Sequence, residues 1–152
     1  MATEPGKTKI KLGRRVLESR LPAGKKRLPR VSKAYIPTDE GKNRLKDYAL
    51  KPDHERGGHK ANLFRERLGF EQDDWKNLHD QILRRLLECW VRRWYVRIVP
   101  EDNPTLRVGL AYEVYVPIDG HEGRRCWVLT AWRLDARMAP FLTTTRPKDP
   151  PD

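Results

Sequence analysis

The chain has 152 residues, a size that suits one folded domain, and 32 Lys or Arg against 21 Asp or Glu, which gives a net charge of +11. Residues 1–33 hold 11 of the basic and two of the acidic residues, so the charge does not by itself show that the folded part binds nucleic acid. No apolar run reaches the length of a signal peptide or a membrane span, and no CxxC or HxxxH spacing accompanies Cys89 and Cys126, which excludes the usual signs of a metal site.

The first half of the chain predicts an arm followed by three helices. Residues 1–33 mix Gly, Pro, Lys and Arg without hydrophobic periodicity, so we expect a flexible basic arm. A short helix is predicted over residues 38–50, and a second over residues 58–68 ends at Gly69. The apolar residues of a third helix, residues 73–90, indicate a face that packs in the core: Trp75, Leu78, Ile82, Leu86, Leu87 and Trp90.

The hydrophobic period changes to two after residue 91, as is typical of strands. Strands are predicted over residues 91–98, 106–118, 126–134 and 141–146, with turns at "PEDNP" (100–104) and "DGHEGR" (119–124). Helices that precede an antiparallel meander predict an α+β domain, with the helices packed on a roughly four-stranded antiparallel sheet. The predicted division of the chain is a flexible basic arm (1–33), the α+β domain (34–147) and a frayed tail (148–152).

Three motifs carry a resemblance to a known family: "GGHKA..F...LGF" (57–70), "Y.VYVPI.G..GR...V.TAW" (112–132) and "FLTTTRP" (141–147). Together with Ile36, Pro37 and "L.DY.L" (45–50), they resemble an uncharacterised bacterial domain family that occurs alone and at the C-termini of polymorphic toxins. The resemblance covers residues 34–147 and implies the barnase, EndoU, colicin and RelE-like ribonuclease superfold. Its members place helices before a four-stranded antiparallel sheet and cleave RNA without a metal. The basic arm, the long segment 92–110 and the closing "LTTTRP" depart from the usual pattern.

Metal-free RNA cleavage needs a base for the ribose 2′-OH, an acid for the leaving 5′-oxygen and cations for the phosphorane. His59 is the candidate base or acid, because histidine titrates near neutral pH and because Gly57 and Gly58 before it allow close backbone approach to a ligand at a helix start. Lys60 would neutralise the phosphate. The competing interpretation is a tight turn with His59 exposed and Lys60 on a solvated face. The other histidines, His54, His79 and His121, fit loop, packing and turn positions better.

The last strand and its neighbours offer further candidates. Thr144 and Arg146 share one side of a strand and would position and neutralise a phosphate, although threonine also simply suits strands. The pattern does not show which side of this strand meets the helices. The candidate substrate-binding residues are Gly57, Gly58, Thr130, Trp132 and Tyr112. Trp132, Tyr112 and Tyr115 suit base stacking, whereas core packing explains two of these three.

The leading hypothesis is a metal-independent endoribonuclease toxin that acts on RNA, uses no cofactor and is neutralised by an acidic immunity protein or antitoxin. The alternative is a noncatalytic nucleic-acid-binding protein anchored by its basic arm, and a third interpretation is an interaction module that has lost the chemistry. We expect a cytoplasmic chain, with delivery to a target cell by a specialised secretion system as another route. No pattern indicates an oligomeric state. Convergence of His59, Lys60, Thr144 and Arg146 on one site favours the enzyme.

Overall fold

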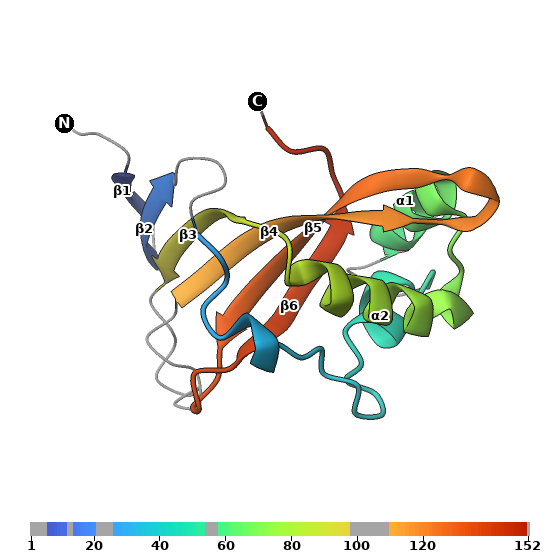
Figure 1. Ribbon diagram of the computed structural model, residues 1–152, viewed down its shortest axis with the longest axis horizontal. Helices are drawn as coiled ribbons and strands as arrows, with labels where there is room; N and C mark the ends of the chain where they lie inside the picture. The colour runs from blue at the N-terminus through green and yellow to red at the C-terminus, as the bar shows by residue number, and fades with distance from the viewer. Residues whose placement is uncertain (1–5, 12–13, 21–25, 54–57, 98–109, 152) are drawn as a thin grey trace.

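The computed structural model describes residues 6–11, 14–20, 26–53, 58–97 and 110–151, and these form one antiparallel sheet with helices at one end (Figure 1). The sheet has six strands in sequence order. They are β1 (Gly6–Lys11), β2 (Arg14–Arg20), β3 (Val91–Arg97), β4 (Leu110–Asp119), β5 (Arg125–Leu134) and β6 (Pro140–Pro147). Every neighbouring pair is antiparallel, so the strands form a meander.

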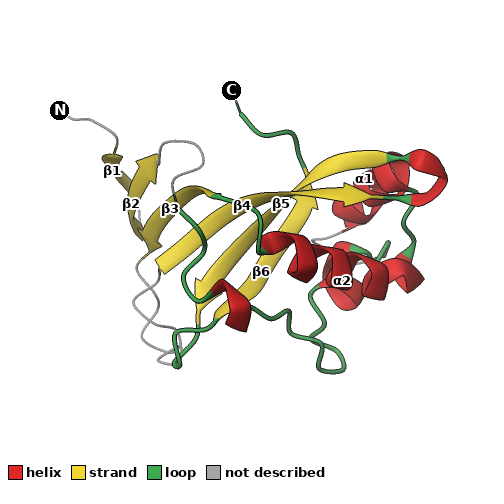
Figure 2. Ribbon diagram, in the orientation of Figure 1, coloured by secondary structure: helices red, strands yellow, loops and turns green. Residues whose placement is uncertain are grey.

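Two α-helices lie between β2 and β3 in the chain, α1 (Gly58–Leu68) and α2 (Trp75–Leu86), at the end of the sheet away from β1 and β2 (Figure 2). Short helical turns connect the larger elements. They are η1 (Val31–Lys33), η2 (Leu45–Ala49), η3 (Gln72–Asp74) and η4 (His121–Gly123). None of the helices in the described part of the chain is long and apolar enough to pass through a lipid bilayer.

The main core fills the space between the two α-helices and one face of the sheet. Phe64, Leu68, Leu78 and Ile82 point from the helices into this core and are fully buried. The sheet contributes alternate residues of β4, β5 and β6, as expected when one face of a strand is buried. These are Val114, Val116, Ile118, Val128, Trp132, Leu134 and Leu142. The predicted α+β architecture is therefore confirmed, and Leu28 and Ile36 extend the core beyond the helices.

The third predicted helix is shorter than expected. α2 ends at Leu86, where the chain leaves the helix and enters β3 five residues later. Leu87 and Trp90 are 49% and 42% exposed, so the prediction that both lie on the core face was wrong. A helical period continued past the true helix end assigns these residues to the wrong side, because the side chains stop following a 3.6-residue repeat.

The four predicted strands correspond to β3 to β6. Ile98, the turn at 100–104 and the start of the second predicted strand lie outside the described residues. Two segments of the predicted arm form β1 and β2, which extend the sheet from β3. The flexibility of the arm in solution stays a prediction, because one conformation does not test it.

Candidate functional site

The site lies on the face of the sheet opposite α1 and α2, which we call the far face. The strand register shows which residues of β3 to β6 lie on this face. They include Arg93, Glu113, Tyr115, Leu129, Ala131, Thr144 and Arg146. One row across the sheet pairs Arg93 with Glu113, Glu113 with Ala131 and Ala131 with Thr144. The adjacent row pairs Tyr115 with Leu129 and Leu129 with Arg146.

A β-bulge in β6 decides which way Thr144 and Arg146 point. Trp132 pairs with Leu142, but its neighbour Ala131 pairs with Thr144, so Thr143 is an extra residue in β6. An extra residue reverses the alternation that follows it. Leu142 therefore faces the main core, whereas Thr144 and Arg146 face away from the helices and are exposed.

Lys60 reaches this face from α1. Its Nζ donates a hydrogen bond of 2.7 Å to the hydroxyl of Thr144 on the edge strand β6. Burial lowers the pKa of Lys60 from its usual 10.5, and the nearby charge of Arg146 lowers it further. A small cavity of about 60 Å³ adjoins this contact and is also lined by Arg44 and Tyr48, whose ring lies 5.0 Å from the Arg44 guanidinium. The site thus joins a helix to the sheet edge.

Glu113 and Arg93 occupy the inner end of the same row. An Arg93 nitrogen lies 2.7 Å from a Glu113 carboxylate oxygen, and the two side chains are 37% and 17% exposed. Two strand spacings separate Glu113 from Thr144, roughly 10 Å between their backbones. Only Ala131, with its single methyl group, lies between them in the row. The Glu113 carboxylate therefore lies at one end of this row, and the Lys60 ammonium contacts Thr144 at the other end.

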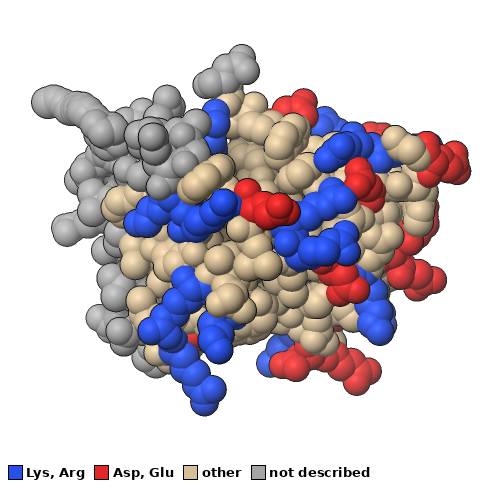
Figure 3. All heavy atoms as spheres, in the orientation of Figure 1, with Lys and Arg blue, Asp and Glu red and all other residues tan. Residues whose placement is uncertain are grey.

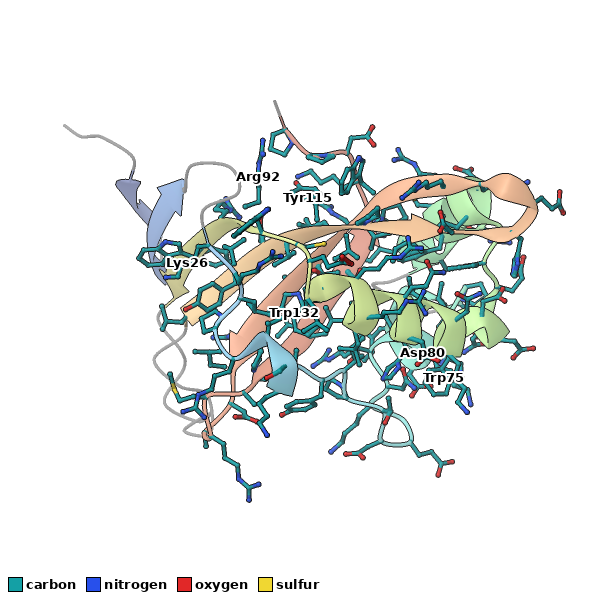
Figure 4. All side chains as sticks on the ribbon, in the orientation of Figure 1. Lys26, Trp75, Asp80, Arg92, Tyr115 and Trp132 are labelled. Atoms are coloured by element: carbon teal, nitrogen blue, oxygen red, sulfur yellow. The ribbon has the colours of Figure 1, made fainter. Side chains whose placement is uncertain are left out.

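Tyr115 links the two rows electrostatically. Burial is the main cause that raises its pKa, and Glu113 raises it further, whereas Arg92, Arg93 and Arg146 lower it. The strand register agrees for Arg146, because Tyr115 and Arg146 both pair with Leu129. Figure 4 shows Tyr115 close to Arg92, with Trp132 lying deeper in the molecule. Tyr115 is 8% exposed.

The structure brings together three of the four predicted catalytic residues. Lys60 contacts Thr144, and Arg146 acts on the charge of Lys60. His59 precedes Lys60 in α1 and is exposed. Consecutive residues of a helix point about 100° apart, and no contact described for His59 ties its ring to Thr144 or Arg146. The structure therefore brings Lys60, Thr144 and Arg146 together, and the role of His59 stays a prediction.

Of the two glycines at the start of α1, Gly58 is explained by packing. A Cβ on Gly58, the first residue of α1, would lie 2.9 Å from the backbone oxygen of Pro52, so the close approach of this loop requires a glycine. Gly57 and His54 lie outside the described residues. The remaining histidines also have local partners. His79 lies 2.8 Å from Asp80, and His121 lies 2.9 Å from Asp74.

Three predicted substrate-binding residues lie on the core side of the sheet instead. Thr130 and Trp132 are fully buried, and Tyr112 is 5% exposed. The Trp132 indole donates to the Thr130 hydroxyl at 2.8 Å, and this hydroxyl donates to the Val114 carbonyl at 2.7 Å. In this structure they offer almost no surface to a substrate, because all three are buried. Their roles are explained by core packing.

The sequence reasoning missed Glu113 and Arg93. One signal was present: Glu113 is the only charged residue in "LAYEVYVPI" (110–118), and a lone carboxylate in an apolar strand marks a position with a special environment. Its partner on β3 could not be inferred, because register is set by the fold. No group of His, Cys, Asp and Glu in the described part of the chain has the arrangement of a metal site.

The arrangement has the components of acid–base chemistry on a phosphate ester. Arg93, Arg146 and Lys60 supply positive charge, Glu113 supplies a carboxylate, and Lys60 has a pKa shifted toward neutrality. Perturbed titratable groups gathered with opposite charges are typical of functional sites.

The comparisons with known proteins place the chain in one family. A family model described as "Domain of unknown function (DUF6883)" matches residues 27–148, which is most of the chain. No curated protein and no solved structure matches it significantly.

Proposed function

We propose that this chain, which belongs to the DUF6883 family, binds RNA on the far face of its sheet and cleaves it without a metal ion. The observation that carries the proposal is that cations flank the acidic groups of this face: Arg93 pairs with Glu113, and the charge of Arg146 acts on both Tyr115 and Lys60. This combination provides a base, an acid and charge stabilisation on one face of the sheet.

Positive charge at the site favours an anionic substrate. The guanidinium of Arg146 is exposed, and guanidinium groups bind phosphate with paired, charge-assisted hydrogen bonds. The rest of the surface is more mixed: on the side seen in Figure 3, Lys and Arg are spread widely, whereas Asp and Glu gather mainly toward the helical end. The basic segment 1–33 would strengthen attraction to any nucleic acid.

The reaction needs two proton transfers, and the row offers a group for each. Glu113 takes the proton of the ribose 2′-OH while the 2′-oxygen attacks phosphorus. Lys60 gives a proton to the 5′-oxygen as its bond to phosphorus breaks, and its lowered pKa makes it the better donor. The products are a 2′,3′-cyclic phosphate and a 5′-hydroxyl. Arg93 and Arg146 stabilise the negative charge that develops on the phosphorane.

The requirement for a 2′-OH restricts this mechanism to RNA. A toxin role rests on the sequence resemblance, and under it an acidic immunity protein or antitoxin would cover the far face. Such a partner would be attracted by the same cations that bind the substrate.

The test is cleavage of a defined single-stranded RNA in EDTA, with the matching DNA beside it. The expected result is RNA cleavage to 2′,3′-cyclic ends and intact DNA. Glu113→Gln and Lys60→Met should each slow cleavage by about 10²–10⁴-fold, the usual contribution of a general acid or base. Glu122→Gln and Lys76→Met are matched controls on exposed positions and should cleave like the wild type.

Other outcomes would lead to different conclusions. RNA that stays intact but binds in a salt-dependent manner would indicate the noncatalytic binding protein. Cleavage that persists in Glu113→Gln but disappears in His59→Ala would return the base to His59 and contradict the role given to Glu113.

A further inference from the structure

A second cavity, of about 480 Å³, lies next to the proposed site, where the end of α2 meets β4 and β5. The last residue pair between β3 and β4 is Val91 with Val114, so the following residues of β4 have no partner strand on this side among the described residues. Arg85 of α2 donates to the Pro117 carbonyl at 2.7 Å there. The cavity shares Arg92 and Tyr115 with the surroundings of the proposed site.

Two exposed tryptophans line this cavity. Trp90 and Trp127 are each 42% exposed, so both rings present part of their surface to the cavity. The Trp90 ring already has a planar cation on one face, because the Arg27 guanidinium lies 4.0 Å from its centre. The Trp127 side chain is on the sheet, in the same row as Pro117. An exposed indole on a rigid strand is a platform on which a flat ring can stack.

The charge around the cavity selects an anion. Arg85, Arg92 and Arg125 line it together with a single acid, Glu88. Arg85 is held by Asp119 at 2.6 Å, and Arg125 lies 3.3 Å from the same carboxylate. Arg92 donates a hydrogen bond to the carbonyl of Pro151. This acceptor is neutral, so a phosphate would replace it as the stronger partner of the guanidinium. A stacking platform surrounded by arginines matches a nucleotide better than an apolar ligand.

We propose that this cavity is a nucleobase subsite, in which one base of single-stranded RNA stacks on Trp127 while an adjoining phosphate meets Arg92. The inference rests on the proposed function, because it assigns a place to a nucleotide beside the one that reacts. The volume of the cavity lies in the range of small-molecule pockets. Tyr115 and Arg92 then connect the subsite to Glu113 and Arg146, so the RNA strand runs continuously from one to the other.

The test measures binding without chemistry. A fully 2′-O-methylated RNA oligonucleotide cannot be cleaved through its 2′-oxygen, and its binding is followed by fluorescence anisotropy of a terminal dye. Trp127→Ala should weaken binding by about 5- to 150-fold, the range measured for one stacked base. Trp127→Phe should restore most of the affinity. Leu87→Ala, a change at another exposed apolar residue outside the cavity lining, should leave binding unaltered.

Scanning one abasic site along the oligonucleotide identifies the stacked base. At one position the loss of the base should weaken binding to the wild type but not to Trp127→Ala. Wild-type affinity in Trp127→Ala would overturn the subsite, even if RNA cleavage is found. Trp127-dependent binding without any cleavage would support the subsite and contradict the catalytic proposal. Tight, Trp127-dependent binding of polyglutamate in place of RNA would assign the cavity to an acidic protein and overturn the nucleobase assignment.

Discussion

Replacing Thr130 with valine removes a hydroxyl that connects β4 to the core tryptophan of β5. The change keeps the shape of the side chain, so it creates almost no cavity. It leaves the Trp132 indole N–H without its acceptor and removes the hydrogen bond to the Val114 carbonyl. A buried donor without a partner costs about 1–3 kcal/mol, and a lost hydrogen bond costs about 0.5–1.5 kcal/mol. The free energy of unfolding should therefore fall by about 1.5–4.5 kcal/mol.

The assay is urea unfolding followed by tryptophan fluorescence. The midpoint should decrease with little change in the dependence on urea, because the surface exposed on unfolding is the same. Thr38→Val is the matched control: its side chain is exposed, so the change should alter stability by less than about 0.5 kcal/mol. A Thr130→Val protein as stable as the wild type would refute the argument that this hydroxyl holds the core together.

Three further predictions concern titration and close packing. The pKa of Lys60 in the folded protein lies below its unfolded value of 10.5, so the unfolded chain binds more protons at pH values between these two pKa values. The stability of the wild type should therefore rise as the pH approaches 10.5. Urea unfolding across pH should show this rise in the wild type but not in Lys60→Met. Burial and the hydrogen bond to the Asp135 carboxylate raise the pKa of Tyr35 from 10.0 to about 12. The contribution of Tyr35 to stability should therefore fall as the pH rises from 10 to 12. An ultraviolet titration should show one phenol that ionises near pH 12 in the wild type and is missing in Tyr35→Phe. A Cβ on Gly120 would lie 2.3 Å from the Leu68 backbone oxygen, so Gly120→Ala should destabilise the fold more than Gly123→Ala, whose Cβ meets open space and whose cost is the positive φ alone, as thermal unfolding would show.

The helix α1 and the strands β3 to β6 could be predicted from the sequence because their hydrophobic periods are clear, whereas the helix predicted over residues 38–50 is only the short turn η2 (Leu45–Ala49). Ala61, Phe64 and Leu68 recur at helical spacing and are all buried, and Gly69 adopts the positive φ that ends α1. The end of α2 was less predictable. Leu87 and Trp90 continue the apolar pattern although the helix has ended, since exposed aromatic residues and core residues look alike in a sequence.

The candidate site depended on features that the sequence does not reveal. Thr144 and Arg146 could be placed on one side of a strand, but the bulge at Thr143 decides that this side faces away from the helices. The pairing of Glu113 with Arg93 joins residues from different strands, and register is set by packing over the whole sheet. Lys60 was identified from its place at the start of a helix, yet its contact with Thr144 comes from the fold.

The central claim is that Lys60 at the sheet edge and Glu113 within the sheet act on the same phosphate. A double-mutant cycle of RNA cleavage in EDTA tests it directly, with Lys60→Met, Glu113→Gln and the combined variant compared with the wild type. Residues that serve one transition state lose far less together than the product of their separate losses. The account predicts a combined variant about as slow as the slower single variant. Fully multiplicative losses, or single variants that cleave like the wild type, would contradict it.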